Sequence, residues 1–172
     1  MPIPFLRIRP HQAHMIFISP SYYLIHKSVV DKILAHKHLQ DIDYFQTDES
    51  RIDEMFDLIK WVKNWYETNI QNVNGKKRGV NVTDTLVTKI LLGTLGCIPA
   101  YDRYFIDGLR TKGLSFSKLT KDNFMPVVNY YKENKNHFDY VQNIIVESSG
   151  IRYPSMKLVD MYFWEIGYES DN

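Results

Sequence analysis

Apolar residues recur at helical spacing along most of this chain. The clearest pattern starts at Thr47 or Asp48, after which one helical face carries large apolar side chains: Ile52, Met55, Phe56, Ile59, Val62 and Tyr66. Charged residues fill much of the remaining surface, as in an amphipathic helix packed on a core. Similar spacing predicts helices over residues 21–38, 117–136 with a kink near Pro126, and 136–146 with Ile144 facing inward. A last helix is expected from Pro154 to Gly167, where the glycine stops it.

These patterns predict an all-α protein, because no segment shows the sustained alternation of a sheet. A length of 172 residues fits a single helical domain spanning 1–172. Residues 1–20 are expected to form an irregular N-terminal arm. Four prolines, Pro2, Pro4, Pro10 and Pro20, interrupt any long helix there.

The stretch from 82 to 109 is the one around which the chain is organised. Between Leu86 and Leu95 apolar residues occupy nearly every face, which predicts a central, buried helix over 82–95. Thr83 or Asp84 can cap its start, while Gly96 and then Pro99 end it. Asp102 follows at the predicted start of the next helix.

Candidate chemistry concentrates around Asp102, which lies between Tyr101 and the pair Arg103-Tyr104. A carboxylate fixed at a helix N-terminus can stabilise positive charge that develops in a transition state. It can equally be an N-cap and nothing more. The tyrosines can stack on an extruded base or pack in the core. Lys89 lies on an otherwise apolar helix and either pairs with Asp102 or reaches the surface, and we group it with Asp102 as the candidate catalytic pair.

Two basic turns flank the central stretch. Lys76, Lys77 and Arg78 lie between glycines, and Arg110 and Lys112 precede Gly113. Such turns are either solvated loops or contacts to nucleic-acid phosphates. We expect all five residues to share one DNA-binding face.

Composition argues against several other classes of protein and kinds of site. The net charge of +1 gives no general basic excess, and the single Cys97 allows neither an intrachain disulfide nor a cysteine metal cluster. His26, His36 and His38 lack residues that complete a ligand set, so neither metal nor cofactor is expected. No apolar run approaches a membrane span and the N-terminus is unlike a signal peptide, so we expect a cytoplasmic monomer.

Ile98-Pro99-Ala100-Tyr101-Asp102-Arg103 resembles the segment after the hairpin in the helix-hairpin-helix DNA glycosylases. The resemblance implies a two-lobed, all-helical fold in which 82–95 is the second hairpin helix. It also implies that Asp102 stabilises the sugar cation formed when a damaged or modified base leaves double-stranded DNA. The hairpin turn would be residues 79–83, with one glycine, Gly79, where the family carries two. Bifunctional members of the family place a nucleophilic lysine near the position of Thr85. Because no lysine stands there in this chain, the resemblance implies that water attacks the sugar.

Two other functions stay open at this point. One is a helical interaction module for protein or nucleic acid with no catalysis, which the near-neutral charge fits. The other is a helical toxin-type RNase, which often carries an arginine followed by a histidine. Here Arg7 to His11 has the wrong spacing and contains a proline, and Lys132 to His137 lacks the arginine.

Overall fold

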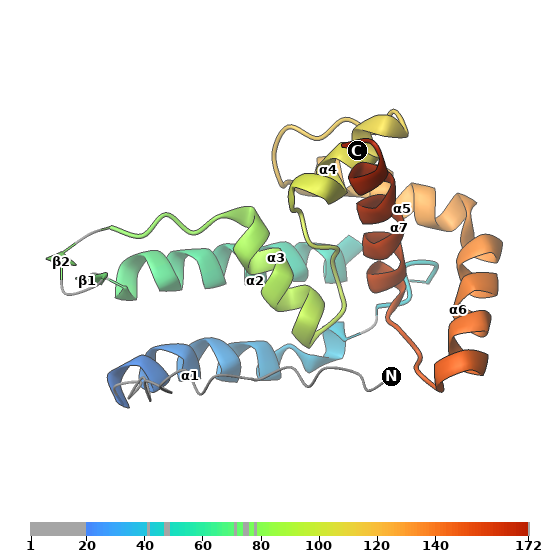
Figure 1. Ribbon diagram of the computed structural model, residues 1–172. Helices are drawn as coiled ribbons and strands as arrows, with labels where there is room; N and C mark the ends of the chain where they lie inside the picture. The colour runs from blue at the N-terminus through green and yellow to red at the C-terminus, as the bar shows by residue number, and fades with distance from the viewer. Residues whose placement is uncertain are drawn as a thin grey trace, which may run out of the picture.

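The computed structural model describes residues 20–40, 42–46, 49–70, 72–73, 76–77 and 79–171, with side chains from 26 onward outside 71–78. Apart from one very short two-stranded ribbon, this part of the chain is helical, as predicted (Figure 1). Its helices are α1 (Pro20–Ala35), η1 (Lys37–Leu39), α2 (Glu49–Asn69), α3 (Asp84–Thr94), α4 (Arg103–Thr111), α5 (Lys121–Glu133), α6 (Lys135–Ser149) and α7 (Ser155–Glu169). Strands β1 (Asn72–Val73) and β2 (Lys76–Lys77) form a minimal antiparallel ribbon between α2 and α3. The N-terminal arm expected over 1–20 lies almost wholly outside the described residues.

Helices α1 and α2 lie side by side and antiparallel, with α3 against α2 (Figure 1). Near the start of α1, His26 Nδ1 lies 3.1 Å from the Tyr66 hydroxyl, close to the end of α2. At the opposite end of the pair, His38 Nε2 lies 2.8 Å from the Glu54 carboxylate. The apolar face predicted for α2 is the buried one, although Phe56 is only partly buried.

One continuous apolar core joins all seven α-helices. Its most deeply buried large side chains come from α2, α3, α4, α5 and α7: Met55, Leu91, Phe105, Phe124 and Phe163. The described residues therefore share a single apolar core.

Helix α3 is not buried on all sides, so that prediction is wrong. Val87, Thr88 and Leu91 face the core, but Leu86 is 47% exposed and Lys89 is also exposed. The reason is that α2 and the following loop cover only one side of α3. The predicted ends of α3 are confirmed. Thr83 accepts a hydrogen bond from Leu86 N, and Gly96, at φ +63°, donates its N–H to Leu91 O at 3.0 Å.

Helices α4 and α7 cross with their backbones in contact. A Cβ added at Gly108 would collide with the Phe163 carbonyl, and one added at Gly167 would collide with the Tyr104 carbonyl. The prediction that Gly167 ends the last helix is therefore wrong, because α7 continues to Glu169. Glycine serves there to admit a neighbouring backbone, not to terminate the helix.

The structure also differs from the sequence-based prediction at the start of α5 and on the buried face of α6. Helix α5 begins at Lys121, where Thr120 accepts a hydrogen bond from Asn123 N, and not at Ser117. Pro126 lies within it. On α6, Ile144 is 46% exposed, so its predicted inward position is wrong; the buried residues of that helix are Phe138 and Gln142. Among the described helices, none combines the length and apolar character required to cross a bilayer.

The α4–α7 contact predicts unequal effects of alanine at three glycines. Gly108→Ala and Gly167→Ala should each lower the free energy of unfolding by about 3 kcal/mol, because backbone cannot move aside as a side chain can. Gly93→Ala is the matched control, since a Cβ there meets nothing within 4 Å. It should leave stability unchanged or raise it by up to about 1 kcal/mol, through helix propensity. Urea unfolding of the three variants measures this, and equal losses at all three glycines would contradict the proposed contact.

Candidate active site

Asp102 is the N-cap of α4, as predicted. Its Oδ1 accepts a hydrogen bond from Phe105 N at 3.1 Å, and its side chain is 18% exposed. The other carboxylate oxygen, Oδ2, lies 3.1 Å from Lys89 Nζ on α3. Lys89 is 55% exposed, so it both pairs with Asp102 and reaches the surface. The structure thus brings together the two residues predicted as a catalytic pair.

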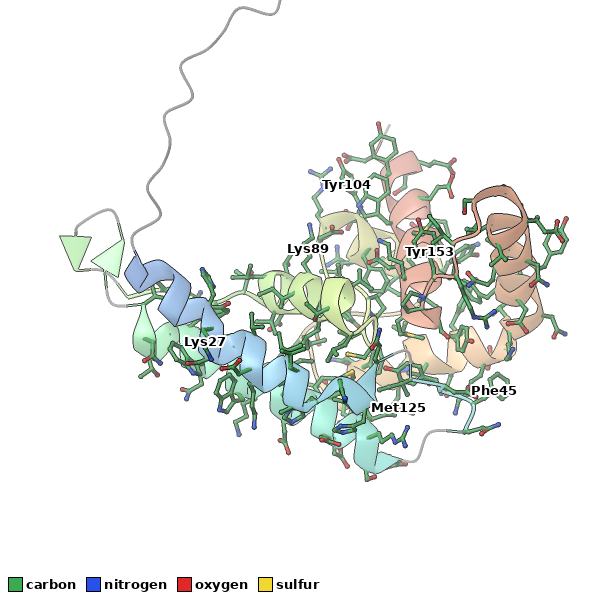
Figure 2. The ribbon with its side chains drawn as sticks, turned by 90° about the horizontal axis from the view of Figure 1, so that it is seen from below. Lys27, Phe45, Lys89, Tyr104, Met125 and Tyr153 are labelled. Atoms are coloured by element: carbon green, nitrogen blue, oxygen red, sulfur yellow. The ribbon has the colours of Figure 1, made fainter. Side chains whose placement is uncertain are left out.

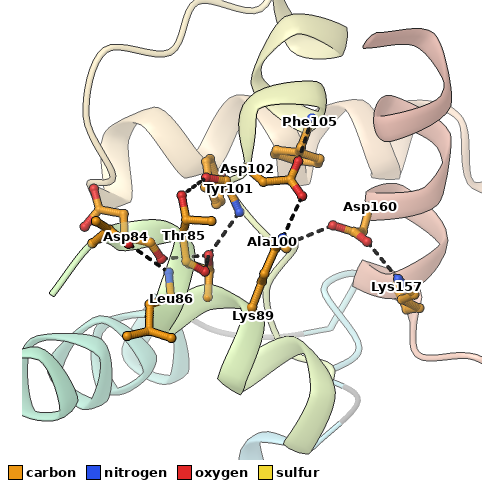
Figure 3. Close-up of polar contacts among 12 residues, drawn as sticks. Asp84, Thr85, Leu86, Lys89, Ala100, Tyr101, Asp102, Phe105, Lys157 and Asp160 are labelled. Carbon is orange, nitrogen blue, oxygen red and sulfur yellow. Dashed lines mark hydrogen bonds and ion pairs between the residues drawn. The ribbon is translucent and has the colours of Figure 1, made fainter. Parts of the chain in front are cut away.

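Side chains from α3 and α7 fix the backbone of the loop that presents Asp102 (Figure 3). Thr88 Oγ1 accepts from Tyr101 N at 3.0 Å, and Thr85 Oγ1 donates to Tyr101 O at 2.7 Å. From the opposite side, Asp160 Oδ1 accepts from Ala100 N at 2.9 Å. The Tyr44 hydroxyl donates to Cys97 O. These bonds satisfy buried backbone groups and restrict the position of the Asp102 carboxylate.

Asp160 is a second carboxylate of this region that the sequence interpretation missed. It is 6% exposed, and its Oδ2 accepts from Lys157 Nζ at 2.8 Å. One sequence feature could have revealed it. It is a lone acid within the apolar face of the last helix, beside Val159, and a buried carboxylate needs partners.

A pocket of about 800 Å³ lies in front of the Asp102–Lys89 pair. Helix α3 contributes Lys89, Leu92 and Gly93 to its wall, and the loop contributes Ala100 and Asp102. Helix α7 forms the opposite wall, from Lys157 and Asp160 to the aromatic rings of Trp164 and Tyr168. Pockets of this size, largely apolar with a few polar groups, are typical small-molecule sites.

Of the four consecutive residues 101–104, only Asp102 lines this pocket. The Tyr104 ring packs in T-shaped contacts with the rings of Trp164 and Tyr168, so it supports the aromatic wall. Arg103 lies over the Tyr104 ring at 5.0 Å and forms an ion pair with Asp171. Both residues are therefore neighbours of the site and do not line it.

Tyr101 does not line the approach to Asp102, contrary to the sequence-based expectation. Its ring is 1% exposed and packs against Phe105 and Phe116. Burial raises the pKa of its hydroxyl well above the usual value for tyrosine. Within the described residues that hydroxyl has no hydrogen-bond partner. The physical reason is that the loop backbone, clamped by Thr85 and Thr88, turns the ring into the core.

The two basic turns are not brought together. Lys76 and Lys77 form β2 at one end of the molecule, whereas α4, which ends in the second turn, lies in the opposite half (Figures 1 and 2). The side chains of Lys76 and Lys77, and Arg78 altogether, lie outside the described residues. Arg110 Nη1 pairs with Asp107 at 2.7 Å, and Lys112 Nζ lies 5.8 Å from the Tyr162 ring centre. Whether any of the five contacts DNA stays a prediction.

Cys97 is a buried core residue, as its sequence context favoured. Burial raises the pKa of its thiol to about 12, which leaves almost no nucleophilic thiolate at neutral pH. Among the described side chains, no cluster of three or more histidines, cysteines or acids is arranged to hold a metal ion.

The glycosylase resemblance concerns two parts of this chain, the segment around Asp102 and the expected hairpin turn at residues 79–83. Asp102 begins a helix after a loop, but residues 79–83 have neither helix nor strand structure and lead from β2 to α3. The ribbon, β1 and β2, therefore comes before the residues where the hairpin turn was expected. Comparisons of the chain with protein-family models, curated proteins and solved structures find no match.

Two buried tyrosines provide a paired test of this geometry. Tyr101→Phe removes a hydroxyl that has no partner among the described residues, so stability should be unchanged or rise by up to about 1 kcal/mol. Tyr44→Phe is the matched control. It removes a hydroxyl that donates to Cys97 O, so it should cost about 1 kcal/mol or more. Urea unfolding measures both, and a larger loss for Tyr101→Phe than for Tyr44→Phe would contradict the structure.

Proposed function

We propose that this protein is a DNA glycosylase that uses water to hydrolyse the N-glycosidic bond of a damaged or modified base. The observation that carries the proposal is a rigidly held carboxylate, Asp102, at the wall of a pocket with an aromatic side. Loop and helix contacts fix this carboxylate before any ligand arrives. Preorganised charge of this kind is a large source of catalysis wherever charge develops during reaction.

Asp102 fits the charge that base excision creates. As the bond between C1′ and the base nitrogen breaks, its electron pair leaves with the base and positive charge spreads over the sugar. A carboxylate beside the sugar stabilises that charge. Water then forms the new bond to C1′ and releases one proton, which the carboxylate or the departing base accepts. The products are a free base and an abasic site.

Lys89 supports this mechanism through its ion pair with Asp102. Lys89 Nζ lies 3.1 Å from Asp102 Oδ2, so it helps to hold that carboxylate in place. In this proposal Lys89 acts as a positioning residue for the Asp102 carboxylate and not as a Schiff-base former.

The α7 wall supports binding of an extruded base. Trp164 and Tyr168 stack on each other with their planes 7° apart, and both line the pocket. Enzymes that act on a base must take it out of the duplex and commonly hold it against aromatic side chains. In this proposal Trp164 and Tyr168 take the part first expected of Tyr101.

The exposed apolar residues Met161 and Trp164 of the pocket wall favour the second candidate, a non-catalytic interaction module. Such a module would bind a partner at this surface without releasing any base.

Double-stranded DNA is the proposed partner. Because the two basic turns are separate, the contribution of each to DNA binding can be measured independently. Lys76→Ala/Lys77→Ala/Arg78→Ala and Arg110→Ala/Lys112→Ala should each weaken duplex binding. Removal of one phosphate-binding cation should flatten the plot of log affinity against log salt by about 0.9. Because the two turns lie far apart, their effects should add. Lys37→Ala/Lys132→Ala serves as the control, and a set that behaves like this control does not contact DNA.

Asp102→Asn tests the chemistry directly. Asn caps a helix about as well as Asp, so folding should be retained, but the negative charge is lost. Single-turnover release of base from a duplex should slow by about 100-fold or more. The matched control is Asp107→Asn in the same helix, which removes a carboxylate paired with Arg103 and Arg110 and should leave the rate near that of the parent.

A panel of damaged and phage-modified duplexes, with alkali cleavage of abasic sites, identifies the substrate for this assay. A folded Asp102→Asn protein that releases base at the parental rate would refute the role of Asp102. Release of base from no duplex would favour the interaction module. A covalent DNA adduct trapped by borohydride would show that the nucleophile is a lysine and not water.

A further inference from the structure

The pocket is longer than a nucleobase. It follows α7 from Lys157 to Glu169, about three helical turns or roughly 18 Å. Its volume of about 800 Å³ lies in the range that accommodates drug-sized ligands. An extruded base would fill one part and leave the rest of the α7 wall open.

The charged groups of this pocket that have no partner among the described residues are carboxylates. Lys89 is paired with Asp102, and Lys157 with Asp160, so both ammonium groups already have a carboxylate. The other two acids of the lining, Glu165 and Glu169, have neither ion pair nor hydrogen bond within the described part of the chain. Two lysines and four acids give the lining a net charge of −2.

Glu165 and Glu169 lie one turn apart on α7, where like charges repel each other. On the neighbouring helix α4, Arg103 already pairs with Asp171 and stacks on Tyr104. Between the two glutamates lies Tyr168, and Trp164 lies one residue before Glu165. An aromatic wall flanked by unpaired carboxylates is the combination that binds organic ammonium groups, through cation–π and ionic attraction together.

We propose that the α7 wall of this pocket, formed by Trp164, Glu165, Tyr168 and Glu169, binds an organic ammonium group. This inference rests on the proposed function where it names the substrate: a DNA base that carries a flexible aminoalkyl arm. The base would lie beside Asp102, and the arm would extend along α7 with its ammonium between the glutamates. A neutral arm of equal length would leave these carboxylates unpaired. An anionic arm would be repelled by them.

Binding of three small probes tests the ammonium site without any catalysis. Butylammonium, butanol and butyrate share one alkyl chain and differ in charge at neutral pH. Protein NMR, read at the indole N–H of Trp164 and assigned with Trp164→Phe, should show butylammonium binding about tenfold or more tightly than butanol. Butyrate should bind most weakly, and added salt should reduce the preference for the cation.

Glu165→Gln/Glu169→Gln should abolish the preference for butylammonium over butanol. The control, Glu133→Gln/Glu147→Gln, changes two glutamates on α5 and α6, away from this wall, and should retain it. Equal binding of all three probes, or a preference that survives in the Glu165→Gln/Glu169→Gln protein, would overturn the proposal.

Paired duplexes connect the site to the substrate. One carries a uracil with an aminopropyl arm, and the other carries the same base with a hydroxypropyl arm. The aminopropyl base should be released about tenfold faster at limiting DNA, and Glu165→Gln/Glu169→Gln should remove that difference. Base release without ammonium preference would reject this substrate class and leave the glycosylase intact. Ammonium binding without release from any duplex would leave the site and reject the glycosylase.

Discussion

The backbone contact between α4 and α7 is the constraint on which the site depends. Gly108 faces the Phe163 carbonyl and Gly167 faces the Tyr104 carbonyl, so the two helices approach more closely than any side chain would allow. Phe105 and Phe163 then pack edge to face beside the crossing. This contact fixes the start of α4, where Asp102 lies, relative to the wall that carries Trp164 and Tyr168. The pocket takes its shape from that crossing.

A second constraint is the need to satisfy buried backbone between α3 and α4. The loop runs through the core, where water cannot serve its N–H and C=O groups. Thr85 and Thr88 serve one side and Asp160 the other, so the bonds that stabilise the loop also orient it. Asp160 can remain buried because both of its oxygens are used, one by Ala100 N and one by Lys157. Stability and the placement of Asp102 therefore depend on the same side chains.

Local features of the sequence were sufficient to predict that the helices exist and where some of them begin and end. Thr83, Gly96 and Asp102 act within one or two turns of themselves, so their roles could be inferred from neighbouring residues. The close crossing could not be, because Gly108 and Gly167 are distant in sequence and each resembles an ordinary helix breaker. The position of Tyr101 was missed for a similar reason. Two threonines from the preceding helix decide where its ring points. The exposed side of α3 was also unpredictable, because apolarity on every face does not say which face lacks a neighbour.

Tertiary packing gives the acidic residues around the pocket different roles. Asp102 and Asp160 each have a lysine partner and a backbone N–H, and thus have fixed positions. Glu165 and Glu169 project from the same helix as Asp160 but beyond the reach of the loop, so no described group neutralises them. The four acids of the lining therefore divide into two that hold the structure in place and two that have no partner among the described residues. An anionic phosphate is unfavourable against that wall, so in the proposed DNA complex the backbone would lie outside the pocket and a base would enter it.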